Sequence, residues 1–409
     1  MNAEQDLPSR TSPQSAIEIS DKSLRAHPGL VLSVPDKVEE SLARDVVCVF
    51  GFPIDRTNLE SLVSEVEAAA QDRRSLNIVT PNLNFATISA TNRDFRDSVR
   101  NADICVADGM PFVWCSRLLG AAIPARVAGS DLFAYLFDHP MKPKLRMFFF
   151  GGKEGVAAQA SLELNNRSKG LIGVGAFNPG FGALDDLDSG SAVASINASG
   201  ADFVSVSLGA QKGLEWIDTH QDKLQPPLIA HLGTVVNIAA KSEQRAPIWM
   251  QKRGLEWLWR ARHDPTLFPR YLRDLKTLIN TIVLRIAPYR VARRFSRRKL
   301  ENPLIAKCTV DARTGAARLK VVGPLCSQTI GSFKKHLSLA ASLQRPVQID
   351  LGGANFIDSE AAGTLILFQR AMVQAGKSVE LANANSRIRR LLKYLQCLEI
   401  LDKPISAPI

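Results

Sequence analysis

The sequence has few cysteines, few histidines and no long apolar run. Its six Cys show no CxxC or other regular spacing, which favours reduced thiols in a protein core over disulfides or a zinc site. The six His are scattered along the chain, so no metal site is expected. No stretch reaches the roughly 18 apolar residues of a membrane-spanning helix. Residues 1–10 carry acidic side chains and lack the apolar centre of a signal peptide, so we expect a cytoplasmic protein.

The chain also lacks the signatures of two classes of binding protein. There is no GxGxxG fingerprint with an acidic residue about 20 positions further on, which disfavours a dinucleotide-dependent oxidoreductase. No nucleic-acid-binding module is recognisable, and we expect no nucleic-acid partner. Apolar residues make up 45% of the chain and charged residues 22%, which is typical of a globular protein. A length of 409 residues indicates two or three domains.

Basic residues are concentrated in one segment. The chain has a formal net charge of +11, and residues 245–299 hold 15 Lys and Arg but three acidic residues. The same segment contains Trp249, Trp257, Trp259, Phe268 and Tyr271. Interleaved aromatic and basic side chains suit an anionic membrane surface, where indoles lie at headgroup depth and cations meet anionic lipid. A solvated helix face that contributes some Trp to the core is the alternative.

Apolar runs alternate with helical patterns from Val46 onward. Residues 1–44 are rich in Ser, Pro and charged residues without a sustained period, and we expect them to be a disordered tail. Strand-like runs follow at residues 46–54, 76–82, 102–109, 145–152, 171–181, 201–211 and 226–237. Strands that alternate with helices predict an α/β fold with a doubly wound, mostly parallel sheet.

Polar residues and glycines follow these strands where each would turn into the next helix. They are Thr80 and Asn82, Asp108 and Gly109, Gly151 and Gly152, and the run from Gly209 to Lys212. The carboxyl edge of a parallel sheet is where open α/β proteins bind ligands. An Asp-Gly pair is also common in turns, so Asp108 by itself fits either interpretation. The Gly151-Gly152 pair precedes a helix and could receive a phosphate on its backbone N–H groups.

A second pattern starts near Ile305 and continues to the end of the chain. It predicts a hairpin around Thr314-Gly315, then a helix, a strand, a helix that begins at Asp358 or Ser359, a strand and an amphipathic helix. About 100 residues suffice for a separate domain. Residues 276–303, which precede it, are expected to form a basic amphipathic linker.

Seven motifs occur in a fixed order between Val46 and Asp274. They read "TPNLNFA", "NADICVADGMPFVW", "IPARVAGSDLF", "FFFGGKEGVA", "INASGADFVSVSLGAQK", "RAPIWMQKRGLEWLWR" and "RYLRDL". In this order they resemble the bacterial WecG/TagA/CpsF glycosyltransferases, glycosyltransferase family 26. The resemblance implies a Rossmann-like α/β domain at residues 45–240 and a helical appendage at residues 241–275. It also implies an inverting, metal-independent transfer from a UDP-sugar to a polyprenyl-diphosphate-linked acceptor at the inner face of the cell membrane, in exopolysaccharide or cell-surface glycan biosynthesis.

The resemblance gives Asp108 a chemical role. An inverting transfer needs a base that takes the proton of the acceptor hydroxyl as its oxygen attacks the anomeric carbon. Asp108 matches the carboxylate that the family is proposed to use for this step. Thr80 and Asn82 match a motif that lies beside the donor, although a cap on the following helix would explain the same residues.

Arginines form the second part of the implied site. Arg126 matches an arginine that meets the acceptor or the diphosphate, a role suited by its fixed charge and paired donors. Arg245, Arg260 and Arg270 match arginines that the appendage contributes as it closes over the site.

The chain departs from the family after the strand at residues 201–209. The family usually has Pro-Lys-Gln-Glu there, whereas this chain has Gln211-Lys212-Gly213-Leu214. The Gln that is thought to contact the donor is therefore missing unless Gln211 takes its place. We assign five further residues to the substrates: Gly109, Gly151, Gly152, Gln211 and Lys212. Asn237 also stands where the family has Asp, so a catalytically impaired transferase-like scaffold is the alternative function.

The C-terminal domain, residues 304–409, resembles STAS domains through the stretch "VQIDLGGANFIDSEAAGTLILFQRA". This fold occurs in anti-sigma factor antagonists and in the tails of sulfate transporters, and it implies a protein partner. The phosphorylatable Ser of those antagonists corresponds to Ser359, and a phosphate there would add about two negative charges at a helix N-terminus. Ser359 as a plain helix N-cap is the alternative, and the adjacent Glu360 would repel a phosphate.

Overall fold

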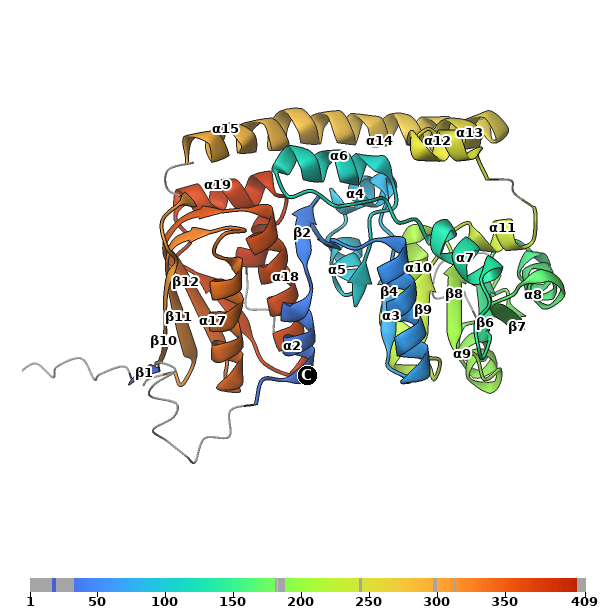
Figure 1. Cartoon of the computed structure of the whole chain (residues 1–409), viewed down its shortest axis with the longest axis horizontal. Helices are drawn as coiled ribbons and strands as arrows, with labels where there is room; N and C mark the ends of the chain where they lie inside the picture. Colours follow the sequence, from blue (N-terminus) through green and yellow to red (C-terminus); the bar gives the residue numbers. More distant parts are fainter. Residues whose placement is uncertain are drawn as a thin grey trace, which may run out of the picture.

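The computed structural model describes residues 17–19, 33–180, 182, 188–242, 245–296, 300–311 and 314–402. Two α/β units lie side by side, one built on a six-stranded sheet and the other on a five-stranded sheet (Figure 1). Most of the expected N-terminal tail, residues 1–16 and 20–32, lies outside the described residues.

The six-stranded sheet carries the first unit. Its strands are β4 (Leu76–Val79), β5 (Ile104–Cys105), β6 (Leu145–Gly151), β7 (Leu171–Phe177), β8 (Phe203–Ser207) and β9 (Leu228–His231). They are arranged in the order β5-β4-β9-β8-β6-β7, and every neighbouring pair is parallel. The predicted doubly wound parallel sheet is therefore confirmed.

Helices cover both faces of this sheet. Successive side chains of a strand point to opposite faces, so Met147 and Phe149 of β6 join one apolar core while Phe148 and Phe150 join the other. The helices that precede, connect and follow these strands are α3 (Leu59–Gln71), α4 (Leu83–Ser89), α5 (Arg93–Arg100), α6 (Met110–Leu119), α7 (Gly129–Asp138), α8 (Val156–Arg167), α9 (Ser189–Ala198), α10 (Ala210–His220) and α11 (Val235–Ala239).

A helical layer follows the sheet and runs across the top of both units (Figure 1). It consists of α12 (Ile248–Lys252), α13 (Glu256–His263), the 3-10 turn η2 (Pro265–Leu267), α14 (Phe268–Thr281), the π-helical turn η3 (Ile282–Ile286) and α15 (Ala287–Phe295). The expected boundary between appendage and linker, at residues 275 and 276, falls inside α14. Helical structure continues from residue 268 to 295, so the described part of the expected amphipathic linker is helical and continuous with the appendage.

The five-stranded sheet carries the second unit. Its strands are β1 (Ile17–Ile19), β10 (Ile305–Val310), β11 (Ala317–Leu325), β12 (Val347–Ile357) and β13 (Val379–Ala382). The predicted hairpin joins β10 to β11, where the Gly315 N–H donates to the Asp311 carbonyl at 2.8 Å. Helices α17 (Ile330–Ser342), α18 (Ser359–Gln374) and α19 (Ser386–Tyr394) and the 3-10 turn η4 (Leu398–Leu401) complete the unit.

Two N-terminal elements differ from the sequence-based expectation. Residues 36–43 form helix α2 (Asp36–Ala43), which packs on α17 and α18 through Val38 and Leu42, so the expected tail is wrong for these residues. The expected strand at residues 46–54 is instead a hairpin of β2 (Val46–Val49) and β3 (Phe52–Asp55). Its turn has positive φ at Gly51, and a Cβ there would lie 2.3 Å from the Gln396 carbonyl oxygen.

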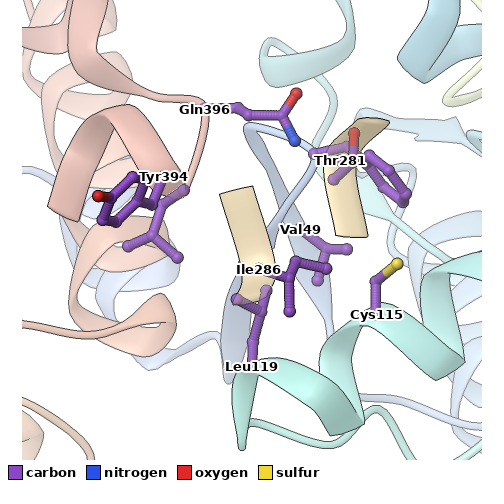
Figure 2. A pocket seen from close by; sticks show the side chains of 9 residues that line it. Val49, Cys115, Leu119, Thr281, Ile286, Tyr394 and Gln396 are labelled. Atoms are coloured by element: carbon purple, nitrogen blue, oxygen red, sulfur yellow. The ribbon is translucent and has the colours of Figure 1, made fainter. Parts of the chain in front are cut away.

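The hairpin, the helical layer and the second unit meet at a closely packed junction. Val49 of β2, Leu119 of α6, Ile286 of η3 and Tyr394 of α19 surround a cavity of about 10 Å³ (Figure 2). A space of this size holds no more than about one water molecule. The two units are therefore joined by continuous packing.

Candidate active site

Asp108 lies at the carboxyl edge of the six-stranded sheet, between β5 and α6. The Val106 N–H donates to the Val79 carbonyl at 3.0 Å, and the Asp108 N–H donates to the Pro81 carbonyl at 3.0 Å. The chain after β5 therefore continues to run beside the chain after β4. Gly109 follows with a φ of 130°, a conformation that favours glycine. Asp108 is thus presented at the edge where such sheets bind ligands.

A cavity of about 1000 Å³ opens at this edge, at the upper end of the range for small-molecule sites. Its walls come from the segments that follow β4, β5, β6, β8 and β9 and from α13, η2 and α14. Among the described residues that line it, the Lys, Arg, Asp and Glu side chains are Lys153, Lys212, Arg260, Arg270, Asp108 and Asp264. The excess of basic side chains suits an anionic ligand such as a diphosphate.

Asp108 is half-buried, and burial raises its pKa to about 7. The positive charges of Arg126 and Arg260 oppose this rise, whereas the negative charges of Glu256 and Asp131 add to it. A carboxyl group with a pKa near neutrality exchanges a proton readily at physiological pH, as a general base must. The geometry therefore supports the predicted chemistry of Asp108.

Arg126 is held in an ionic network next to Asp108 and does not line the cavity itself. Its Nη2 lies 2.8 Å from Asp131 Oδ2 and its Nη1 lies 3.1 Å from Glu256 Oε2. Arg245 binds the other carboxylate oxygen of Asp131 at 2.6 Å. Glu256 belongs to α13, so this network connects the helical layer to the sheet beside Asp108.

Thr80 and Asn82 both line the cavity. Asn82 is also the N-cap of α4, because its Oδ1 accepts from the Asn84 N–H at 3.1 Å. The two interpretations of Asn82 are therefore compatible. Thr80 is buried at the end of β4 and packs against Gly129, where an added Cβ would lie 3.3 Å from Thr80 Oγ1.

The two glycines after β6 do not offer the expected pair of free N–H groups. Gly152 lines the cavity, but its N–H donates to the Ser207 carbonyl at 3.1 Å. Gly151 packs under Leu208, since an added Cβ would lie 2.8 Å from Leu208 Cδ2. Close packing of β6 against β8 thus explains Gly151, whereas a Cβ on Gly152 would lie 3.2 Å from Val236 Cγ1 of α11. The expected phosphate contact of the Gly152 N–H is wrong, because this N–H is already bonded to Ser207.

In the segment that departs from the family, the space beside Gly213 is occupied by a side chain of another strand. Gln211 is exposed on α10 and does not line the cavity, whereas Lys212 does and donates to the Gly182 carbonyl. Gly213 lies against His231 of β9, and an added Cβ would lie 2.5 Å from His231 Cδ2. His231 lines the cavity, and burial lowers its pKa. Gln211 therefore does not replace the missing Gln.

The three predicted arginines of the helical layer occupy different places. Arg260 and Arg270 line the cavity, and Arg245 does not. Arg260 Nη2 donates to Thr234 Oγ1 at 3.2 Å. The Arg270 guanidinium lies 5.0 Å from the ring centroid of Tyr271. Its Nε is buried without a hydrogen-bond partner among the described residues.

Ser359 lies outside this cavity, at the interface between the two units. Its side chain is fully buried, and its Oγ donates to the Cys48 carbonyl at 2.8 Å. The N-cap of α18 is Asp358, whose Oδ1 accepts from the Ala361 N–H at 3.0 Å. The interpretation of Ser359 as an N-cap is therefore wrong. A phosphate on Ser359 would require the interface to open.

Sequence reasoning missed several residues of the site. Glu256 precedes Arg260 by four residues on α13, and this spacing of opposite charges was the one available signal. His231 contacts residues that are distant in sequence, so no local pattern indicates it. Asp131 pairs with Arg126, five positions before it, and with the distant Arg245, so the short Arg126–Asp131 spacing was a local signal. Lys153 directly follows the Gly151-Gly152 pair and could have been found from its position at the sheet edge.

Other features bear on the class of site. The six cysteines are free and buried. In the part of the chain that the structure describes, no group of three or more His, Cys, Asp or Glu could hold a metal ion. Within the same residues, every helix is too short or too polar to cross a membrane.

Comparison with protein families defines the class. Residues 47–291 match the family described as "Glycosyl transferase WecG/TagA/CpsF family", and the chain belongs to this family. The protein is therefore a glycosyltransferase. Residues 308–401 match the model described as "Mlab, STAS domain". Both resemblances seen in the sequence are confirmed.

Curated relatives carry a more specific name. The chain is 26% identical over 229 residues to the N-acetylglucosaminyldiphosphoundecaprenol N-acetyl-beta-D-mannosaminyltransferase of Staphylococcus aureus strain MW2, which covers 56% of this chain and 88% of the relative. Proteins of the same name from strains NCTC 8325 / PS 47 and N315 match with the same identity and coverage.

Proposed function

We propose that the protein transfers a sugar from a UDP-sugar to a polyprenyl-diphosphate-linked acceptor, with inversion and without a metal ion or other cofactor. The observation that carries this proposal is Asp108, with a pKa raised to about 7, on the wall of a cavity lined by basic side chains. The relatives' name specifies an undecaprenyl-diphosphate-linked acceptor, which supports this class of acceptor. The product would enter an exopolysaccharide or another cell-surface glycan.

In the proposed reaction the Asp108 carboxylate accepts the proton of the acceptor hydroxyl. The hydroxyl oxygen then forms a bond to the anomeric carbon while the bond between that carbon and the nucleotide diphosphate breaks. Negative charge increases on the leaving diphosphate. Lys153, Lys212, Arg260 and Arg270 line the same cavity and stabilise that charge.

We further propose that the helical layer binds the inner face of the cell membrane, where the acceptor is anchored. The outer side of α14 and η3 exposes a row of apolar side chains at helical spacing: Phe268, Leu272, Leu275, Ile279 and Val283. Exposed basic residues flank this row, among them Arg273, Lys276, Arg290 and Arg294. Apolar insertion together with attraction to anionic lipid supports peripheral binding. Of the basic residues expected at this surface, Arg297 and Arg298 lie outside the described residues.

A catalytically impaired scaffold is the second candidate function. Gly213 favours it, because glycine offers no side chain where the family has the Gln that is thought to contact the donor. In that case the protein would act through its STAS domain and would not transfer a sugar.

Substitution of Asp108 tests the proposed reaction. We expect Asp108→Asn to lower transfer by roughly two to four orders of magnitude, the usual contribution of a general base, and to retain donor binding. The assay would supply a panel of UDP-sugars and a polyprenyl-diphosphate-linked N-acetylglucosamine acceptor, and calorimetry would report donor binding.

The matched control is Asp222→Asn, which changes an exposed carboxylate on the 3-10 turn after α10. Near-normal turnover by Asp108→Asn would contradict the assignment. A wild-type protein that binds a UDP-sugar and transfers none would favour the scaffold.

A further inference from the structure

The STAS domain is attached to the transferase through buried and partly buried polar contacts of helix α18. Near its start, Arg56 Nη1 donates to Glu360 Oε1 at 2.6 Å, in addition to the contact of Ser359 with the β2–β3 hairpin. About three turns further along the helix, Arg370 Nη1 donates to the Ala102 carbonyl at 2.6 Å and its Nη2 to Asp103 Oδ1 at 2.8 Å. The face of α18 that could receive a separate protein is thus occupied by the transferase of the same chain.

Asp103 connects this contact to two strands of the active site. It immediately precedes β5, and its second oxygen, Oδ2, accepts from the Asn77 N–H of β4 at 2.9 Å. A single carboxylate therefore joins Arg370 to the beginnings of β4 and β5. The first of these strands leads to Thr80 and Asn82, and the second leads to Asp108.

The position of β5 depends strongly on such contacts. It is a two-residue strand at the edge of the sheet, paired with β4 alone. Its outer side is covered by the hairpin, where Asp55 Oδ2 accepts from the Cys105 N–H at 2.7 Å. Asp55 is in turn bound by Arg44, whose carbonyl accepts from Lys334 of α17 at 2.7 Å. A second path thus runs from the STAS domain to the strand that carries Asp108.

We propose that the STAS domain is a positioning domain for the transferase and that Arg370 is the positioning residue through which it acts on Asp108. This proposal rests on the proposed function of Asp108. Arg370 touches neither the cavity nor a substrate, and its effect passes through Asp103 and β5. The planar guanidinium reaches a carbonyl and a carboxylate at once, which the single ammonium of a lysine does less well.

The test uses the full chain with Arg370→Ala and Arg370→Lys. We expect Arg370→Ala to lower kcat at least tenfold and to move the midpoint of the kcat–pH profile away from about 7, because the surroundings of Asp108 set its pKa. Arg370→Lys should recover part of the lost kcat and part of the shift in the pH midpoint. Arg390→Ala, which removes an exposed arginine of α19, should match the wild type. A wild-type kcat and pH midpoint in Arg370→Ala would overturn the proposal.

Hydrogen exchange separates this proposal from the proposed function. Arg370→Ala should raise amide exchange at residues 103–109 at least tenfold and leave β7, at the opposite edge of the sheet, unchanged. Unchanged exchange at residues 103–109 would overturn the proposal even if the protein proved to have no transfer activity. If Arg370→Ala fails to fold, Asp103→Asn weakens the same ion pair from the other side. The kcat–pH profile and the amide exchange at residues 103–109 of that variant then decide the proposal in the same way.

Discussion

At the scale of single residues, the proton on Asp108 couples activity to stability. Its pKa rises from an ordinary 3.8 to about 7 in the folded chain, so the folded state holds this proton more tightly than the unfolded state. The contribution of Asp108 to stability therefore falls as the pH rises from about 4 to about 7. Asparagine is neutral throughout. We expect Asp108→Asn to match the wild type below pH 4 and to exceed its free energy of unfolding above pH 7, as measured with denaturant.

The same carboxyl predicts the opposite trend for turnover. A base must be unprotonated, so kcat should increase through a midpoint near pH 7. A kcat that stays constant from pH 5.5 to pH 8.5 would show that Asp108 is not the base.

Gly213 and His231 form a second residue-scale pair. Restoring the family's Gln at position 213 would bring its Cβ to 2.5 Å from His231 Cδ2. We expect Gly213→Gln to lose about 1–3 kcal/mol of stability, as overpacked cores do. The double variant Gly213→Gln/His231→Ala should regain most of this loss. A loss in the double variant equal to the sum of the losses in Gly213→Gln and His231→Ala, measured by denaturant unfolding, would show that the two positions are not coupled.

Some of these residues were predictable from sequence and others were not. Asp108, Thr80 and Asn82 follow apolar strands, and parallel strands bring their carboxyl ends to one edge, so the local pattern predicts their place in the fold. The catalytic role of Asp108 comes from the family resemblance and not from this pattern. Asp358 and Ser359 are both residue types that cap helices, so the sequence alone does not show which of them caps α18. In the structure the Ser359 hydroxyl donates to the Cys48 carbonyl, 311 positions away, and Asp358 is the N-cap. The prediction that Gln211 faces the substrate was wrong, because the packing of α10 sets the direction in which this side chain points.

At the scale of elements, α14 presents apolar side chains on two sides. Leu278 is buried beneath it, whereas Leu272, Leu275 and Ile279 are exposed on its outer side. Exposed apolar rows of this kind often mark an interaction surface. A helix that only packs on the core would be polar outside, so the outer row supports contact with lipid.

Liposome flotation tests the outer row. We expect the wild type to float with vesicles that contain anionic lipid and to float less as salt increases. The combined variant Leu272→Ser/Leu275→Ser/Ile279→Ser should abolish flotation, and Arg273→Gln/Lys276→Gln should weaken it, because each basic residue contributes about 1 kcal/mol. Leu162→Ser, at an exposed position on α8, is the control. Equal flotation with neutral vesicles would contradict the expected attraction between the basic residues and anionic lipid.

The β2–β3 hairpin shows why element boundaries were harder to predict than the sheet. Residues 46–54 have the apolar character of one strand, and the turn within them lacks the usual Asn-Gly or Asp-Gly signal. Gly51 is required there by the Gln396 carbonyl, which comes from the other end of the chain. Sequence patterns within the hairpin contain no information about that contact.

At the scale of the whole molecule, the transferase and the STAS domain share one apolar core. A single cluster of buried side chains runs from Val38 and Phe52 through Trp216 to Phe356 and Ile400. Partly buried ion pairs cross the same interface, where Glu399 accepts from Arg96 and Arg100 at 2.6 and 2.7 Å. The two domains therefore stabilise each other, and we expect the wild type to unfold in a single cooperative transition.

Ser359 is the position at which that cooperativity can be tested. Ser359→Asp would place a carboxylate in a fully buried site, facing the Cys48 carbonyl and near Glu360. An unpaired buried charge costs several kcal/mol, so we expect this variant to separate the unfolding of the two domains into two transitions. Ser359→Ala loses one hydrogen bond and should cost about 1 kcal/mol within one transition. Ser386→Asp is the matched control, because Ser386 is also the first residue of a helix after its N-cap but is exposed. A single transition of wild-type midpoint in Ser359→Asp, followed by calorimetry, would show that the interface opens at little cost and would restore Ser359 as a candidate for phosphorylation.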